Sequence, residues 1–174
     1  SGRFAVTTAL GEQRENVSGR FHLEIRGSQQ AVELASPLGT TVARVEIEPG
    51  GARATGAQMQ EVRGADADTL TQQLLGWPLP VSGLVDWIEG RPVPTRVARV
   101  EREGGRVVLV EQDGWTIRLP EYSEATARPR RLVLERPSAA NTPSVVLRLI
   151  VDEPGGSNQT GIFGCITGFT ENKS

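Results

Sequence analysis

The sequence contains very few cysteine, histidine and aromatic residues. Among its 174 residues are one cysteine, Cys165, one histidine, His22, and eight aromatic residues of the Phe, Trp and Tyr types. A lone cysteine cannot form an intramolecular disulfide. Most zinc sites need several His or Cys ligands, so we expect neither a metal centre nor a metal cofactor. No run of about 18 apolar residues occurs, and we therefore predict no membrane-spanning helix.

The sequence also has no large excess of positive or of negative charge. Nineteen Lys and Arg residues stand against 21 Asp and Glu residues, which gives a net charge of −2. No basic field is present to hold nucleic acid, and no cluster of Lys and Arg along the chain suggests an electrostatic membrane anchor. The phosphate-binding loop, the dinucleotide fingerprint and the Gly-x-Ser-x-Gly elbow are all absent. We expect a protein that binds without a cofactor and is not an enzyme.

What the sequence does contain is an alternation of apolar and polar residues over most of its length. This period of two is typical of antiparallel strands with one buried face. Turn-forming residues at 49–51, 104–105 and 113–114 separate the alternating segments. The clearest of these segments are residues 21–26, 43–47, 115–119 and 145–151. About nine or ten strands are indicated, which predicts a mainly β protein with one large curved sheet or barrel.

Two short helices interrupt the strands. Asp66 suits a helix N-cap and Gly76 a C-terminal stop, with an apolar stripe between them. A second helix is predicted at about residues 81–89, closed by Gly90, and residues 77–80 connect the two. Helices of two or three turns are not stable alone. We therefore expect both to lie against the sheet.

The last residues differ from the rest of the chain. Residues 155–158 are typical of a linker, and the apolar residues after them show no clear period. We interpret residues 1–153 as one domain and residues 154–174 as an extension. The chain begins directly in strand-like sequence, and we expect the natural protein to be longer.

A sheet of this size with few bulky side chains can enclose either packed side chains or a cavity. Both interpretations are open from the pattern alone.

In the turn at Pro37, Leu38 and Gly39, the two turn-forming residues present Leu38 at the tip of a loop. A single exposed leucine is usually without function. As a membrane contact it would contribute roughly 1.5–3 kcal/mol, enough for transient binding only.

Several segments together resemble the LolB family of outer-membrane lipoprotein receptors. Their order and spacing match that family from about Gly2 to Val151, and the stretch from Asp66 to Pro92 is the most specific. The matching segments are residues 2–6, 18–21, 34–41, 65–67, 75–80 and 84–92.

This resemblance implies an incomplete, strongly curved antiparallel β-barrel of about ten strands, with short helices covering its mouth. It implies that the protein takes acylated lipoproteins from the periplasmic carrier LolA and inserts them into the inner leaflet of the outer membrane. The full-length protein is expected to be a monomer on the periplasmic face, anchored through an acylated N-terminal cysteine that this sequence lacks. In the family a leucine of the Pro-Leu-Gly loop is implicated in delivery, and Leu38 matches it.

We predict that acyl chains lie against apolar residues on the inner strand faces and the helices. These residues are Phe21, Leu23, Leu34, Val45, Leu70, Leu74, Trp77, Leu84, Trp87, Ile88 and Trp115. A periplasmic lipocalin-like binder of a small hydrophobic ligand would share such a cavity. A lipid hydrolase would need a nucleophile–base pair, for which one histidine offers little. A structural envelope protein would have a filled interior.

Overall fold

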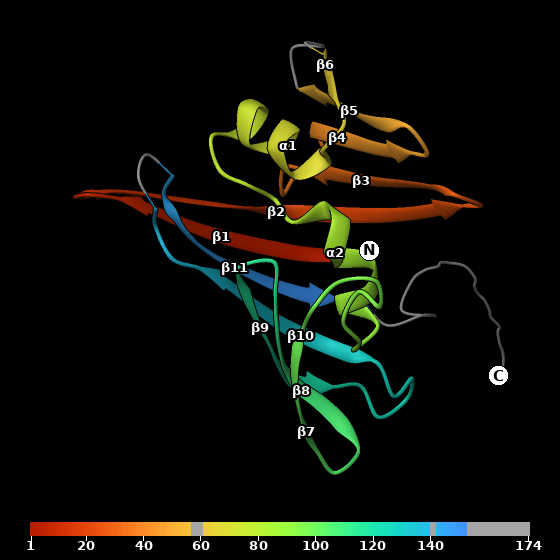
Figure 1. Ribbon diagram of the computed structural model, residues 1–174. Coiled ribbons are helices and arrows are strands. Elements are labelled where there is room, and N and C mark those ends of the chain that lie inside the picture. Colours follow the sequence, from red (N-terminus) through yellow and green to blue (C-terminus); the bar gives the residue numbers. More distant parts are fainter. Residues whose placement is uncertain (57–60, 140–141, 153–174) are drawn as a thin grey trace, which may run out of the picture.

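The computed structural model describes residues 1–56, 61–139 and 142–152. They form one antiparallel sheet of eleven strands, with two helices on one of its faces (Figure 1). The extension predicted at residues 154–174 lies outside the described residues. The strands are β1 (Gly2–Leu10), β2 (Gln13–Arg26), β3 (Gln29–Ala35), β4 (Thr41–Glu48), β5 (Gly51–Gly56), β6 (Glu61–Gly64), β7 (Arg99–Glu103), β8 (Arg106–Gln112), β9 (Trp115–Tyr122), β10 (Pro129–Arg136) and β11 (Ser144–Val151).

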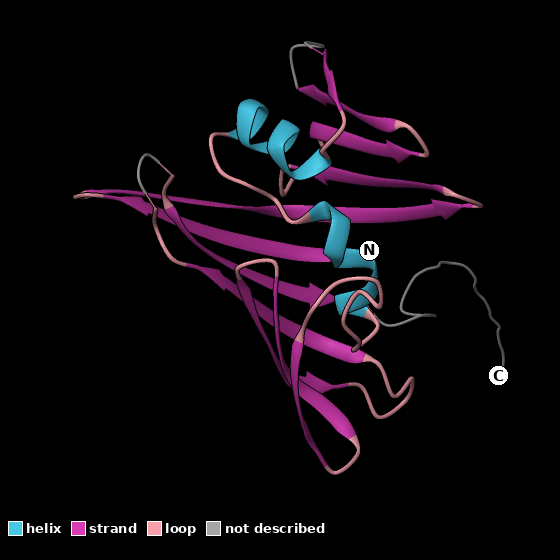
Figure 2. Ribbon diagram, viewed as in Figure 1, coloured by secondary structure: helices cyan, strands magenta, loops and turns pink. Residues whose placement is uncertain are grey.

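The strand order explains why the helices cross the sheet. It runs β6-β5-β4-β3-β2-β1-β11-β10-β9-β8-β7, so the first and last strands pair in the middle. Strands β6 and β7 are consecutive among the strands along the chain, yet they lie at opposite edges of the sheet. The segment between them must therefore pass over one face, and it contains α1 (Ala67–Leu75) and α2 (Val81–Ile88) (Figure 2).

The predicted local signals agree with the structure at the helix ends and turns. Asp66 caps α1 by accepting a hydrogen bond from the backbone N–H of Asp68 at 3.1 Å, and Gly76 ends the helix with a φ of +87°. The two-residue turn at Asp113 and Gly114 has positive φ at both positions, as a tight hairpin requires. The alternation in β1 likewise places Phe4 and Val6 in the core and Arg3 and Ala5 outside.

The finer prediction of barrel shape is not what the structure shows. One mainly β, antiparallel sheet with two short covering helices is confirmed, with eleven strands instead of about ten. The sheet, however, is open and not strongly curled. The predicted barrel was incomplete, and β6 and β7 indeed form no ladder with each other, but the strong curvature that was also predicted is not present. The bulky side chains Trp77 and Trp87 of that crossing are buried and occupy the space that a barrel would enclose.

Candidate functional site

The apolar face of the sheet and the helical crossing form one hydrophobic core. Of the predicted lining residues, eight are buried in it: Phe21, Leu34, Val45, Leu70, Trp77, Leu84, Trp87 and Trp115. The remaining three, Leu23, Leu74 and Ile88, are partly buried and pack against it. The structure thus brings all eleven predicted residues into one connected cluster.

Within this core lies a small void between the sheet and the crossing segment. Its volume is about 10 Å³, which holds no more than one water molecule. Four predicted residues border it: Phe21, Leu34, Trp77 and Leu84. Five others that the sequence analysis did not select complete the wall: Phe4, Val32, Leu79, Leu147 and Leu149. At this void, the space between the sheet and the crossing segment is therefore filled almost completely by these nine side chains.

The C-terminal end of α2 is fastened by one buried glutamine. Gln112 is only 3% exposed. Its Oε1 accepts hydrogen bonds from Trp87 Nε1 and from the Val93 backbone N–H, both at 2.9 Å. Its Nε2 donates to the carbonyls of Val93 at 3.0 Å and Arg96 at 3.1 Å. All four hydrogen-bonding positions of the amide are therefore used, which ties α2 and the following loop to β8.

The other end of α2 is fastened by a carboxylate from α1. Asp68 accepts hydrogen bonds from the Ser82 backbone N–H at 3.1 Å and from the Ser82 hydroxyl at 3.0 Å. Burial raises the pKa of Asp68 and Asp66 adds to the rise, whereas the Ser82 hydrogen bonds and Arg96 oppose it. Arg96 donates to Ser82 Oγ at 3.3 Å and pairs with Asp113 at 3.1 Å. Polar contacts therefore hold α2 at both ends of an apolar interface.

The predicted insertion loop is an ordered turn with an exposed tip. Leu38 is 96% exposed. The turn is closed by hydrogen bonds from Ser36 N–H to the Thr40 carbonyl at 2.8 Å and from Gly39 N–H to the Ser36 carbonyl at 2.9 Å. The φ of Gly39 is +95°, a conformation that favours glycine. Leu38 is thus held away from the core by its own turn.

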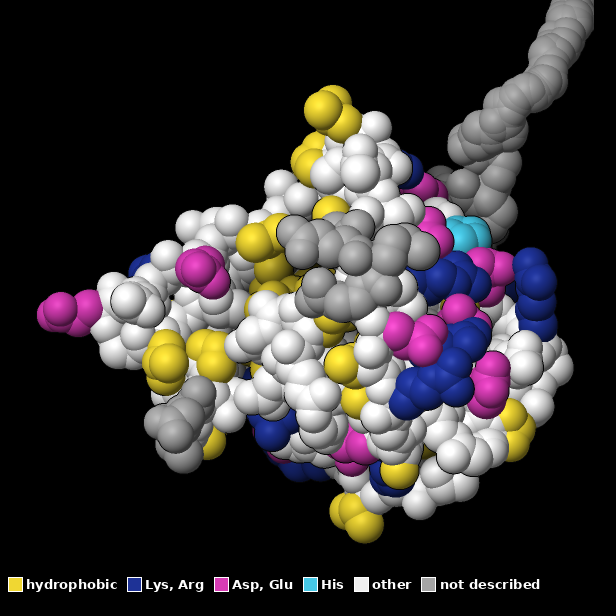
Figure 3. All heavy atoms as spheres, turned by 90° about the horizontal axis from the view of Figure 1, so that it is seen from above, with side chains coloured by type: hydrophobic (Ala, Val, Ile, Leu, Met, Phe, Trp, Pro, Cys, Tyr) yellow, Lys and Arg dark blue, Asp and Glu magenta, His cyan; other side chains and the backbone are white. Residues whose placement is uncertain are grey.

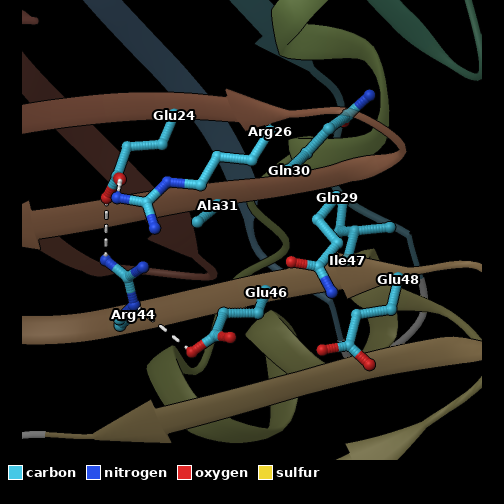
Figure 4. A pocket seen from close by; sticks show the side chains of 9 residues that line it. All are labelled: Glu24, Arg26, Gln29, Gln30, Ala31, Arg44, Glu46, Ile47 and Glu48. Atoms are coloured by element: carbon cyan, nitrogen blue, oxygen red, sulfur yellow. Dashed lines mark hydrogen bonds and ion pairs between the residues drawn. The ribbon is translucent and has the colours of Figure 1, made fainter.

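The outer face of the sheet, opposite the helices, is polar. On β2, β3 and β4 it carries an ion-pair network in which Arg44 contacts Glu24, Glu33 and Glu46 at 3.2–3.3 Å. Figure 4 shows the contacts of Arg44 with Glu24 and Glu46. Glu46 also forms an ion pair with Arg53 at 2.7 Å. A pocket of about 100 Å³ lies here, but its charged walls do not suit an acyl chain. Seen from above, hydrophobic side chains lie in the middle of the molecule and opposite charges alternate along one side (Figure 3).

Two further observations bear on other site types. Among residues 1–56, 61–139 and 142–152, no group of three or more His, Cys, Asp and Glu side chains could hold a metal ion. In the same part of the chain, no helix is long and apolar enough to cross a bilayer. His22 is exposed on β2, as its alternation predicted, and its Nδ1 lies 2.6 Å from the hydroxyl of Ser1.

Comparison with known proteins decides among the alternatives that share an apolar interior. The family model described as "Outer membrane lipoprotein LolB" matches residues 1–153. This chain belongs to the LolB family. It is therefore an outer-membrane lipoprotein receptor on the periplasmic face, not an enzyme, and it accepts lipoproteins from LolA and inserts them into the outer membrane.

Individual relatives agree with this assignment. The outer-membrane lipoprotein LolB of Ralstonia nicotianae is 38% identical over 161 residues, covering 87% of this chain and 77% of that protein. LolB of Thiobacillus denitrificans is 40% identical over 152 residues, covering 87% of this chain and 76% of its own length. LolB of Bordetella pertussis is 36% identical over 156 residues, with 88% and 76% covered. The family match at residues 1–153 spans the sheet, the crossing segment and the Leu38 turn.

Proposed function

We propose that this LolB-family chain, acting as a monomer through the domain at residues 1–153, holds the acyl chains of lipoproteins between its sheet and its helical crossing. The observation that carries the proposal is the void beside Trp77 and Leu84, which is walled entirely by apolar side chains. Because its volume is about 10 Å³, acyl chains enter only when the side chains of Trp77, Leu79 and Leu84, which border it, move away from the sheet. The eleven predicted residues then form the wall of the enlarged cavity, and those bordering the void make the first contacts.

The energetics of this opening are balanced. Withdrawing the buried side chains of Trp77, Leu79 and Leu84 from the sheet costs roughly 5–9 kcal/mol in lost burial. Each acyl methylene group that takes their place contributes about 0.8 kcal/mol, so about ten methylene groups restore the loss. One ordinary membrane acyl chain supplies that number. An acylated cargo can therefore open the site, whereas a small hydrophobic ligand gains too little.

The handover steps follow from the same balance. Transfer from LolA requires only that the acceptor holds the chains more tightly, and a difference of 1.4 kcal/mol already gives a tenfold bias. The bilayer buries all of the acyl chain and so holds it more tightly still. In the final step the exposed Leu38 contacts the inner leaflet of the outer membrane, where burial of one leucine gives a brief attachment.

The proposal is tested by making room beside the void. Leu84→Ala removes a side chain that must otherwise be displaced, so we expect a fluorescent acylated lipopeptide to bind about tenfold more tightly than to the wild-type chain. Ile117→Ala is the matched control, because Ile117 is fully buried but does not border the void. Both variants lose about 2–5 kcal/mol of stability. Equal changes in lipopeptide affinity for the two variants would refute the location of the site.

A further inference from the structure

Five arginines gather on the outer face of the sheet, opposite the helices. The register places Arg3 of β1 beside Arg20 of β2, and Arg148 of β11 beside Ala5 of β1. On the other side of β11, Arg131 pairs in register with Ile150, and Val133 of β10 lies between Arg148 and Arg118 of β9. All five side chains are exposed. We call Arg3, Arg20, Arg118, Arg131 and Arg148 the arginine face.

This face carries uncompensated positive charge although the whole chain has a net charge of −2. Arg20 pairs with Asp152 at 3.3 Å, Arg118 with Glu135 at 3.3 Å, and Arg131 with Glu121 at 2.7 Å. Arg130 also lies 3.7 Å from Glu121 and shares that carboxylate. Within the part of the chain that the structure describes, no carboxylate lies within 4.0 Å of Arg3 or Arg148. The neighbouring network around Arg44 is, by contrast, compensated by three glutamates.

The arginine face is also hollowed and partly apolar. A groove of about 240 Å³ is bordered by the side chains of Arg3, Arg131 and Arg148, with Ala5 and Ile150 among the residues between them. Shifts of register between β9 and β10, on either side of Arg131, break the regular ladder beside the groove. Guanidinium groups around an apolar floor suit a phosphate group joined to a hydrocarbon-rich body.

The groove lies at the level of the sheet where the Leu38 turn begins. Arg20 pairs in register with Ala35, the last residue of β3, and the turn that carries Leu38 follows directly. Arg3 lies on the other side of Arg20. The positive charges and the exposed leucine are therefore presented from the same region of the sheet.

We propose that the arginine face docks this protein on the phosphate groups of anionic phospholipids and so orients it for delivery. The inference rests on delivery of lipoproteins to the outer membrane, and it assigns part of the membrane contact to a surface separate from the acyl site. The apolar floor and the nearby Leu38 favour a lipid surface over an acidic protein as the occupant. Leu38 provides the apolar contact, and the arginines provide charge attraction that one leucine lacks.

The test measures binding of the cargo-free protein to vesicles at low ionic strength. Vesicles of phosphatidylcholine are compared with vesicles that also contain phosphatidylglycerol. The variant Arg3→Gln/Arg148→Gln removes two charges that pair with no carboxylate of the described residues, so it leaves none of those carboxylates without its partner. The control Arg14→Gln/Arg102→Gln removes the same charge from the β1–β2 hairpin tip and from β7, where both arginines are exposed.

We expect the wild-type chain to bind the anionic vesicles more tightly than the neutral ones. The Arg3→Gln/Arg148→Gln variant should lose about 25-fold in partition, since one arginine near an anionic surface accounts for about fivefold. The control should change by less than about threefold, because its charges lie away from the groove. Equal losses in both variants would overturn the proposal. So would unchanged vesicle binding with weakened binding to LolA, which would identify the face as a protein-docking surface. Binding of lipopeptide from LolA is measured in parallel. If a variant loses lipopeptide binding but keeps its vesicle binding, the acyl site is affected and the vesicle result still decides the docking proposal.

Discussion

Replacing Gln112 with leucine tests whether α2 is held in place mainly by one buried amide. Leucine fits a site of similar size but can make none of the four hydrogen bonds that Gln112 makes with Trp87, Val93 and Arg96. The indole N–H of Trp87 would lose its partner in a place that water does not reach, because Trp87 is only 1% exposed. The groups of Val93 and Arg96 are half-buried and regain some bonds to water.

The expected loss follows from these differences in burial. A buried donor or acceptor left without a partner costs about 1–3 kcal/mol. With one such group fully buried at Trp87 and three partly hydrated, we expect Gln112→Leu to lower the free energy of unfolding by about 2–4 kcal/mol. Gln72→Leu is the matched control. Gln72 is half-buried in α1 and donates one long hydrogen bond, 3.4 Å to Thr142, so its loss should stay within about 0.5 kcal/mol.

Urea unfolding of both variants measures these losses from the midpoints, with the slopes required to stay unchanged. Stopped-flow mixing with the fluorescent lipopeptide adds a functional readout. Because Gln112→Leu frees one end of α2, we expect the lipopeptide to bind faster to it than to the wild type. A destabilisation below about 1 kcal/mol, or an unchanged rate of lipopeptide binding, would refute the view that Gln112 fastens α2.

Three further outcomes follow from the structure. Leu38→Glu should still accept lipopeptide from LolA but fail to transfer it to liposomes. The control Val97→Glu changes another almost fully exposed residue and should transfer lipopeptide normally. Failure of both variants would show that transfer does not depend on the Leu38 turn in particular. The fold raises the pKa of Asp68 above its ordinary value of 3.8, so ionising it costs more free energy in the folded than in the unfolded chain. The free energy of unfolding should therefore fall as the pH rises from 3.8 through the raised pKa. Unfolding titrations of Asp68→Asn should lack this fall, and pH profiles identical to those of the wild type would contradict it. Gly83→Ala should lower the free energy of unfolding by about 1–3 kcal/mol, although alanine has the better helix propensity. The reason is that the added Cβ would lie 2.4 Å from the ring of Trp87. A higher melting temperature in thermal unfolding would contradict this packing.

Residue patterns alone predicted much of the secondary structure and the membership of the core. The N-cap at Asp66, the stop at Gly76 and the inward residues Phe21 and Leu34 follow from local rules that need no knowledge of the fold. The location of α2 over the sheet follows from the strand order, which depends on pairing between β1 and β11 across the whole chain. Alternation says which face of a strand is buried but not what covers it.

The parts of the site that were missed are those assembled from distant residues. The sequence shows no basic cluster, because each of the five arginines of the arginine face lies on a different strand. Gln112 carried a weak signal, since it is a polar residue at an inward position two residues after Val110. The degree of filling could not be predicted either, because it depends on how far Trp77 and Leu84 reach into the space above the sheet.

The central claim, that acyl chains replace the crossing segment against the sheet, is tested most directly by fluorescence quenching with a brominated acyl lipopeptide. Trp87→Phe/Trp115→Phe leaves Trp77, which borders the void, as the only tryptophan, and Trp77→Phe/Trp87→Phe leaves Trp115, which lies away from it against Arg136. We predict strong quenching of Trp77, which makes one of the first contacts, and weaker quenching of Trp115, which lines the enlarged cavity without bordering the void. Binding of the lipopeptide with no quenching of Trp77 would contradict the account.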